Sequence, residues 1–319
     1  MSTFEKIRQS CRSASLEACH VKINSDFLNE YFIQLSSSLP DTLSMDEQNH
    51  FCGDNDKTVN YFVVLDCINF GSGFFDHLAC DPGKTGYFTI ASRLKKDFLK
   101  HGEFSCDYLS ALTAADCCRI FAQNGNDPTV AELMQMFSQA LNELGTYVKM
   151  NFNGSFTQML ESAEHSAEKL LQILTGMKYY QDTAIHFGKP VYFYKRAQIT
   201  ASDLNIALKG QGPGFFKDID RLTIFADNLV PHVLWRDKAI SYSDELERKI
   251  RSGESLDAGS DYEIELRAAA VHTVELLVKI GKQQFPDITS QKLDFILWNR
   301  GQAEYYRTIP PHKTRTFFY

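Results

Sequence analysis

The chain has 319 residues, a formal net charge of −7 and a hydrophobic content of 44%. Hydrophobic and charged fractions of this size are those of an ordinary soluble globular protein. Because proteins that bind DNA or RNA need a basic face, the acidic charge argues against a nucleic-acid polymer as the main partner. A mononucleotide stays open as a partner, since it needs only a local basic cluster.

All eight cysteines lie within the first 118 residues. They form no CxxC pair and no zinc-like Cys/His spacing, so we expect free thiols in a reducing compartment, with no metal and no cofactor. The N-terminus carries charges where a signal peptide needs an apolar block, and no apolar run reaches membrane-spanning length. These features predict a cytoplasmic protein that does not enter a membrane.

The N-terminal part alternates helical patterns with turns. Amphipathic helices are expected over residues 3–20 and 25–37, followed by a polar surface loop over 38–57. The apolar run YFVVLDCINF (61–70) fits either a strand or the end of a buried helix. Its Asn69 could read the polar edge of a ligand, or could complete a turn before glycine. Short helical pieces separated by turns are expected over 85–123.

The signal is clearer from residue 128 onward. Pro128 and the capping box Thr129-x-x-Glu132 predict a long helix, because apolar residues follow at helical spacing. After a turn, a further helix is expected from an N-cap at Ser155 to about Leu174.

The segment 191–232 is the centre of the functional prediction. Apolar positions recur at helical spacing over 194–208, and a glycine follows, which predicts a helix there. On this helix Arg196 and Asp203 are seven residues apart and share a face, with Lys195 turned away from them. The following GQGPG turn lacks the lysine of a phosphate loop. It is typical of a connection between two helices, although its amides could meet an anion.

Asp227 is the main catalytic candidate. A short apolar helix is expected after the glycine turn, and Asp227 follows the apolar pair at its end. A half-buried carboxylate beside aromatic groups can stabilise positive charge that develops on a sugar, or can activate water. The alternative is a C-terminal helix residue that pairs with Arg221 or Arg236.

Two more helices and an aromatic tail complete the chain. Ser260-x-x-Glu263 predicts a helix that continues to about 280, and a last helix begins near Thr289. Glu265 lies among apolar neighbours on the first of these helices, either as a site residue or paired with an arginine.

The tail PPHKTRTFFY (310–319) ends in aromatic residues, which predicts that it docks on the body of the protein. Docking would bring His312, Lys313 and Arg315 to one spot, suited to a phosphate. A surface tail with scattered basic residues is the alternative.

This order of elements predicts a mainly α fold in a single domain, 1–319, with few short strands. The layout of a helix, a glycine hairpin, a second helix and an Asp is similar to that of the helix-hairpin-helix DNA glycosylases. We expect a monomer.

Several motifs, spread over nearly the whole chain in order, resemble the queuosine salvage family, whose members are queuosine 5′-phosphate N-glycosylases. They are EACHVKI (17–23), NFNGSF (151–156), FYKRAQI (193–199), FKDIDRLTIFAD (216–227), YSDELERKIRSGESL (242–256), YEIELRAA (262–269), LDFILW (293–298) and PHKTRTFFY (311–319). The resemblance implies hydrolysis of the N-glycosidic bond of queuosine 5′-monophosphate. The products would be queuine, a 7-deazaguanine base that can be reinserted into tRNA, and ribose 5-phosphate.

The same matching puts the family's catalytic aspartate on Asp227 and implies that Lys195 and Asp203 belong to the pocket. An ionised Asp227 would stabilise an oxocarbenium-like sugar, and Lys195 would tune Asp227 or donate a proton. The candidates to contact the base are Phe193, Tyr194, Phe70, Trp298 and Asn69.

The sequence departs from the family at 69–75, where NFGSGFF lacks the expected tryptophan and Phe74 or Phe75 would substitute. Two other functions stay open: a non-catalytic queuine or nucleobase binder, and a nucleic-acid glycosylase, which the acidic charge disfavours.

Overall fold

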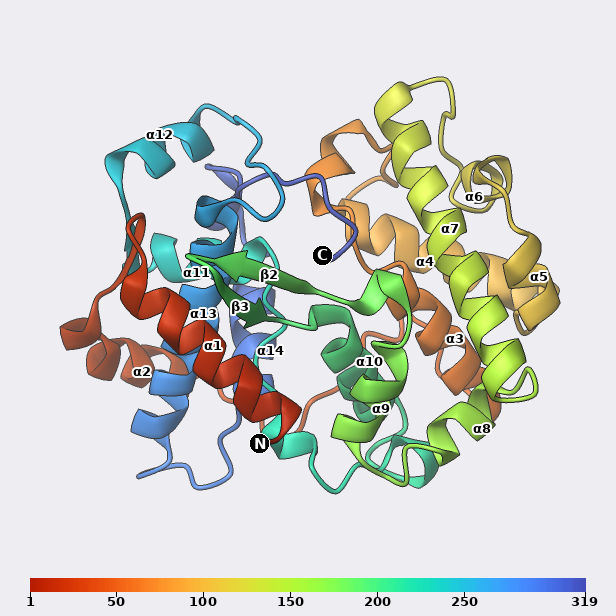
Figure 1. The fold of residues 1–319 in the computed structure, drawn as a ribbon, viewed down its shortest axis with the longest axis horizontal. Coiled ribbons are helices and arrows are strands. Elements are labelled where there is room, and N and C mark those ends of the chain that lie inside the picture. Colours follow the sequence, from red (N-terminus) through yellow and green to blue (C-terminus); the bar gives the residue numbers. More distant parts are fainter.

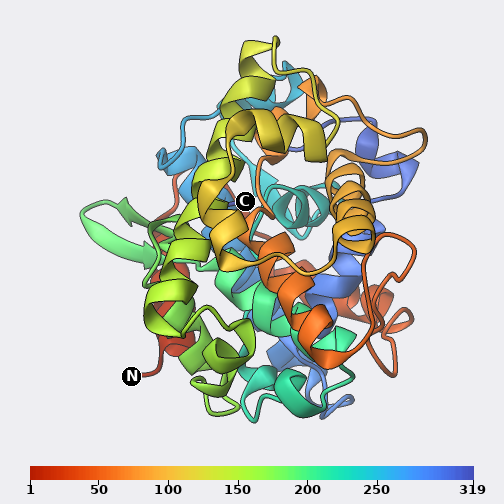
Figure 2. The ribbon, with the colours of Figure 1, turned by 90° about the vertical axis from the view of Figure 1, so that its right-hand side faces the viewer.

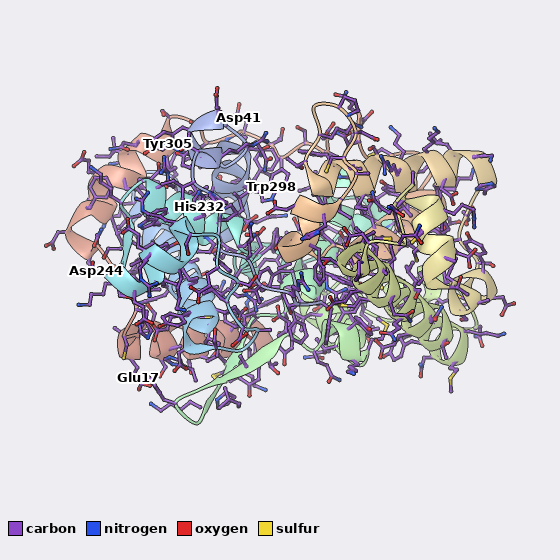
Figure 3. The ribbon with its side chains drawn as sticks, turned by 90° about the horizontal axis from the view of Figure 1, so that it is seen from above. Glu17, Asp41, His232, Asp244, Trp298 and Tyr305 are labelled. Carbon is purple, nitrogen blue, oxygen red and sulfur yellow. The ribbon has the colours of Figure 1, made fainter.

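The protein, described over all residues 1–319 by a computed structural model, consists of helices in two groups that lie side by side (Figure 1). Figure 3 shows the same two groups from above, with Trp298 near their boundary. One group contains α3 (Asn55–Cys67), α4 (Gly86–His101), α5 (Cys106–Ala111), α6 (Ala114–Ile120), α7 (Pro128–Asn151) and α8 (Phe156–Glu161). The other contains α1 (Thr3–Glu17), α2 (Leu28–Ser36), α11 (Leu229–Arg236), α12 (Asp244–Arg251), α13 (Asp261–Gly281), α14 (Ser290–Arg300) and α15 (Glu304–Arg307).

Helices α9 (Ala167–Leu174) and α10 (Lys195–Ala207) lie between the groups and pack on each other. The longest helix of each group forms its centre: α7 packs on α3, α5 and α6, whereas α13 packs on α1, α2, α11 and α14. One continuous cluster of buried apolar side chains runs through both groups. The mainly α prediction is therefore confirmed. None of the helices is both long and apolar enough to cross a membrane.

Four short strands form two separate antiparallel pairs. Strand β1 (Val21–Ile23) pairs with β4 (Ile240–Tyr242), with Val21 opposite Tyr242. Strands β2 (Thr183–His186) and β3 (Lys189–Tyr192) form a hairpin that projects from the body (Figure 2). Short 3-10 turns connect other elements: Ser25–Phe27, Ser72–His77, Lys178–Tyr180, Gly212–Gly214 and Ile219–Arg221.

The apolar run that fitted either strand or helix is helical, because it belongs to α3. This helix begins inside the stretch expected to be a loop, where the Asp54 side chain accepts a hydrogen bond from the Lys57 amide at 3.0 Å. Every residue from Thr58 to Cys67 is buried, so the helix has no polar face. A helix buried on all sides loses the 3.6-residue pattern that would identify it in the sequence.

Two predicted helix boundaries are wrong, and in both cases another side chain provides the cap. Helix α7 begins at Pro128 because the Asp127 carboxylate accepts from the amides of Thr129 and Val130 at 2.8 and 3.2 Å. The helix from Ser155 is broken near His165, whose φ is positive, and Ser166 caps a new helix. The caps predicted at Ser155 and Ser260 are confirmed, and the last helix begins near Thr289 as predicted, with Thr289 as its cap.

The glycine turn does not lead directly into a helix, so the short apolar helix expected before Asp227 is wrong. Between α10 and α11 the chain forms only the two 3-10 turns at 212–214 and 219–221, then an extended segment. Asp227 consequently lies just before helix α11 rather than at the end of a helix.

The C-terminal tail docks on the body, as its aromatic residues predicted. Tyr319 is buried, and its backbone oxygen accepts from the Gly71 amide at 2.9 Å. The tail passes so close to Gly73 that a Cβ there would lie 2.2 Å from the Thr314 carbonyl oxygen. Glycine is therefore required in the NFGSG segment for the tail to reach its position.

Candidate active site

A cavity of about 760 Å³ lies where the two helix groups meet. Its walls come from the end of α3, the start of α4, one face of α10, the segment 225–229, helix α14 and the C-terminal tail. Cavities of several hundred Å³ with apolar walls and a few polar groups are typical of small-molecule sites.

Helix α10 contributes five side chains to this cavity: Lys195, Ile199, Ser202, Asp203 and Ile206. The expectation that Asp203 shares its face with Arg196 rather than Lys195 is wrong. Arg196 turns into the core, where its guanidinium donates to the carbonyl oxygens of Cys67 and Tyr179.

Lys195 is the buried cation of the site. Its Nζ donates to the backbone oxygen of Asn69 at 3.0 Å and to the Asn69 side-chain oxygen at 3.2 Å. Burial lowers the pKa of Lys195, and the negative charge of Asp227 opposes this shift. The amino group is thus held beside Asn69, close enough to Asp227 for the two charges to interact.

Asp227 is fixed by the start of helix α11. Its Oδ1 accepts from the amides of Leu229 and Val230 at 2.8 and 3.0 Å, which leaves Oδ2 free of protein partners. Burial raises the pKa of Asp227, whereas Lys195, these two amides and Arg267 favour the ionised form. The side chain lines the cavity and forms no salt bridge with Arg221 or Arg236, so the alternative role expected for it is not observed.

Three further carboxyl groups surround this pair. Asp203 and Asp294 line the cavity, and burial raises their pKa values to about 7 and about 8, respectively. Asp294 also accepts from the Phe225 amide at 2.9 Å. Asp66 is fully buried on α3 with neither oxygen hydrogen-bonded; burial and the charge of Asp203 raise its pKa. One ammonium group therefore faces four carboxyl groups that differ in their tendency to ionise.

Aromatic side chains form much of the cavity wall. Trp298 contacts both Tyr87 and Phe88 edge-on, at ring-centroid distances of 5.8 and 5.6 Å. On the α3 side, Phe70 and Phe75 line the cavity, whereas Phe74 is buried in the core. Flat walls of this kind are suited to a planar ligand. No group of three His, Cys, Asp or Glu side chains is placed to hold a metal ion.

Comparison with known proteins places the chain in a family. The model of the queuosine salvage protein family matches residues 49–319. The chain belongs to this family. Over the full length of both chains it is 32% identical to a Dictyostelium discoideum protein named queuosine 5′-phosphate N-glycosylase/hydrolase. Proteins with the same name from Sphaerobacter thermophilus and Bos taurus are 34% and 33% identical, covering 85% and 84% of this chain and 84% and 83% of their own lengths.

Six of the site residues expected from the sequence line the cavity of this queuosine salvage protein. They are Asp227, Lys195, Asp203, Asn69, Phe70 and Trp298. The cavity thus collects residues from segments that are as much as 229 positions apart in the chain, between Asn69 and Trp298.

The other expected residues lie outside the cavity. Phe193 is buried with its ring 4.0 Å from the Arg267 guanidinium, and Tyr194 stacks on Tyr192. Glu265 accepts from the amides of Cys19, His20 and Val21, at 3.0, 2.6 and 3.2 Å. It thereby holds strand β1 against α13 and pairs with no arginine.

The basic residues of the tail do not meet at one spot. His312 is buried against Tyr319, and Arg315 forms a surface pair with Glu132 at 3.3 Å. Only Lys313 lines the cavity, where it also pairs with Asp76.

Four polar residues close to the site were not expected from the sequence: Asp66, Asp182, Arg267 and Asp294. Asp66 and Asp294 share a signal that could have identified them, a single acid inside an apolar run (VVLDCINF and LDFILW). Asp182 and Arg267 carry no such signal, because their pairing joins positions 85 residues apart.

Proposed function

We propose that this protein hydrolyses the N-glycosidic bond of queuosine 5′-monophosphate and releases queuine and ribose 5-phosphate, so that the base can return to tRNA. The name carried by relatives over the full chain length supports this activity. The observation that carries the proposal is that Asp227 and Lys195 line the same cavity with aromatic walls and interact through their charges.

In the proposed reaction the bond between C1′ and the base nitrogen breaks, and its electron pair leaves with the base. Positive charge develops on the sugar, and the ionised Asp227 stabilises it through the oxygen that no protein group occupies. A water molecule then adds its oxygen to C1′, with Asp227 accepting the proton. The departing base takes up one proton from solvent, and Asp227 later returns its proton to solvent, so the reaction consumes one water molecule and the atoms balance.

The other cavity residues have proposed roles in binding. Trp298 and Phe70 contact the planar base, and Asp203 and Asn69 read its polar edge. Because a 7-deazaguanine lacks N7, protonation at that position cannot assist its departure. Lys195 supplies positive charge near the leaving group and keeps Asp227 ionised.

Other features of the proposal concern the whole protein. The net charge of −7 favours a mononucleotide over a nucleic-acid polymer as substrate. The continuous apolar core supports a single domain over 1–319. We also propose that the protein acts as a monomer in the cytoplasm, where its free cysteines would stay reduced.

The test is chromatography of queuosine 5′-monophosphate after incubation with the wild type and with Asp227→Asn. Asparagine can keep the two bonds to the α11 amides through its own oxygen, so the variant should fold while losing the charge. We expect a loss of kcat of roughly 10²–10⁴-fold. No queuine from the wild type would refute the activity, and equal release by both proteins would refute the role of Asp227. A non-catalytic binder would instead retain queuine without turnover.

A further inference from the structure

A second buried cation, Arg267 on α13, lies behind the cavity wall, and each of its three guanidinium nitrogens donates at least one hydrogen bond. Its Nε donates to the backbone oxygen of Ala226 at 2.9 Å. Its two terminal nitrogens donate to both carboxylate oxygens of Asp182, at 3.0 and 2.6 Å, and to Glu263 at 3.1 Å. The plane is enclosed by the ring of Phe193 at 4.0 Å and the ring of Tyr319 at 4.5 Å. A bidentate pair between two aromatic rings fixes a guanidinium in position as well as orientation.

Asp182 continues this chain of contacts to helix α10. The same Oδ2 that binds Arg267 accepts from the backbone amide of Lys195 at 3.0 Å. The residue before the helix, Tyr194, provides no side-chain cap and has a left-handed backbone. Asp182 therefore supplies the negative charge that the start of α10 needs, and also receives the amides of Phe193 and Tyr194 on its backbone oxygen.

Arg267 thus bonds on one side to Ala226, the residue next to Asp227. On the other side, through Asp182, it holds the residue that provides the amino group of the site. One segment precedes α11, and the other follows the β2–β3 hairpin. Gln198 of α10 also joins them, because its side chain accepts from the Thr223 amide and donates to the Thr223 hydroxyl, both at 2.9 Å. Arg267 adds a second connection, which reaches the residue next to Asp227.

We infer that Arg267 is a positioning residue of the reaction, which acts through Ala226 and Asp182 to fix the separation and charge balance of Asp227 and Lys195. This inference rests on the proposed hydrolase activity. Glycosidic cleavage needs the carboxylate and the cation at defined places around the sugar, and a displacement of about 1 Å can cost on the order of 100-fold in rate.

The charge of Arg267 adds a second effect that can be measured separately. The charged groups that act on Asp227 are Lys195 from α10 and Arg267 from α13, and Asp294 from α14 interacts with it in turn. Arg267 lowers the pKa of Asp227 against the effect of burial. The acid limb of the pH profile of kcat/KM follows the ionisation of Asp227 in the free enzyme. Removing the charge of Arg267 should therefore move this limb to higher pH.

The experiment compares Arg267→Gln, Arg267→Lys and Asp182→Asn with a matched control, Arg8→Gln. Arg8 also connects α13, through Glu275 at 2.6 Å, to the backbone oxygen of Arg221 at 2.8 Å, but it lies away from the cavity. For each protein, kcat, KM, the pH profile of kcat/KM and the melting temperature are measured with queuosine 5′-monophosphate.

For Arg267→Gln we expect kcat to fall roughly 10–100-fold with a smaller change in KM, and the acid limb to move to higher pH. Arg267→Lys keeps the charge but loses the bidentate geometry, so kcat should fall while the acid limb stays near that of the wild type. Asp182→Asn removes a negative charge, so its kcat should fall without an upward movement of the limb. Arg8→Gln should retain the kinetics of the wild type whatever its melting temperature.

A purely structural role would give folded variants with wild-type kcat and an unmoved acid limb, and this result would overturn the inference. If Arg267→Gln does not fold, Arg267→Lys and Asp182→Asn decide, and kcat within twofold of the wild type in both would overturn it. Failure of the hydrolase activity is recognised separately, because the wild type itself would then release no queuine.

Discussion

The unpaired carboxyl of Asp66 makes the stability of this protein depend on pH in a direction opposite to that of most surface acids. Asp66 is fully buried, and neither of its oxygens has a hydrogen-bond partner. Burial, and then the charge of Asp203, raise its pKa well above the ordinary value of 3.8, against the opposing effects of Lys195, the nearby Asn69 side chain and Arg196. In the folded protein the group therefore stays protonated at pH values where the unfolded chain has already ionised.

The sign follows from proton linkage. Below pH 3.8 both states are protonated and the group has no effect on stability. As the pH rises above this value, ionisation of this carboxyl lowers the free energy of the unfolded state but not that of the folded state. Stability is lost at about 1.4 kcal/mol per pH unit until the folded pKa is reached. Asp66→Asn has nearly the same shape and cannot ionise, so it escapes this loss.

We therefore expect Asp66→Asn to gain stability relative to the wild type as the pH rises from 5, by about 1.4 kcal/mol per pH unit for as long as the folded wild type keeps the proton on Asp66. Urea unfolding at pH 5, 6 and 7 measures this difference. The control is Asp54→Asn, at the exposed cap of the same helix, where bonding to the Lys57 amide lowers the pKa. That group titrates below pH 3.8, so its difference from the wild type should stay constant over this range. A constant difference for Asp66→Asn as well would show that Asp66 is already ionised in the folded protein.

Two further predictions concern the cations at the cavity. Lys195→Met should fold, because it removes a buried charge, but should lose kcat/KM by roughly 100-fold or more in the queuine-release assay; near-normal turnover would exclude a catalytic role for the amino group. Lys313→Ala should raise KM for queuosine 5′-monophosphate by roughly tenfold with little change in kcat, because Lys313 lines the cavity and can meet the phosphate. Arg315→Ala should leave KM within about twofold, since that side chain pairs with Glu132 on the surface; an equal rise in KM would contradict the assignment.

Local patterns in the sequence were sufficient to predict most helices. The helix over 194–208, the caps at Ser155 and Ser260 and the start of the last helix near Thr289 were predicted from spacing and capping residues, and the structure contains them. The same signals failed where a competing side chain was available a few residues away. The residue that caps α7 is Asp127 and not Thr129. In α3, no periodic pattern distinguished the buried helix from a strand.

The orientation of side chains was harder to predict than the helices that carry them. On a helical projection Arg196 lies nearer to Asp203 than Lys195 does, yet Lys195 reaches the cavity with Asp203. The reason is that two backbone oxygens and the rings of Phe70 and Tyr180 hold the guanidinium of Arg196 in the core. Those partners come from distant segments, and no local pattern reveals them.

The distribution of charge in the cavity indicates why Asp227, rather than another carboxyl group, serves as the catalytic carboxylate in the proposed reaction. One lysine cannot hold every nearby carboxyl group in its ionised form, because each unpaired buried charge is costly. Asp66 has no partner, and Asp294 accepts one backbone amide and has a pKa raised to about 8. Asp227 has two amides at the start of α11 and two cations, Lys195 and Arg267, that favour its charge.

The carboxyl group with the most stabilising partners, Asp227, still keeps one oxygen free of hydrogen bonds to the protein in the cavity. Its position before a helix, rather than after one, creates this combination, because only the start of a helix offers unpaired amides to a carboxylate. A helix ending at residue 227 would have placed the negative end of its dipole against the same charge. The sequence wrongly predicted a helix that ends before Asp227. The position of Asp227 at the start of α11 is the feature that makes it suitable for the reaction.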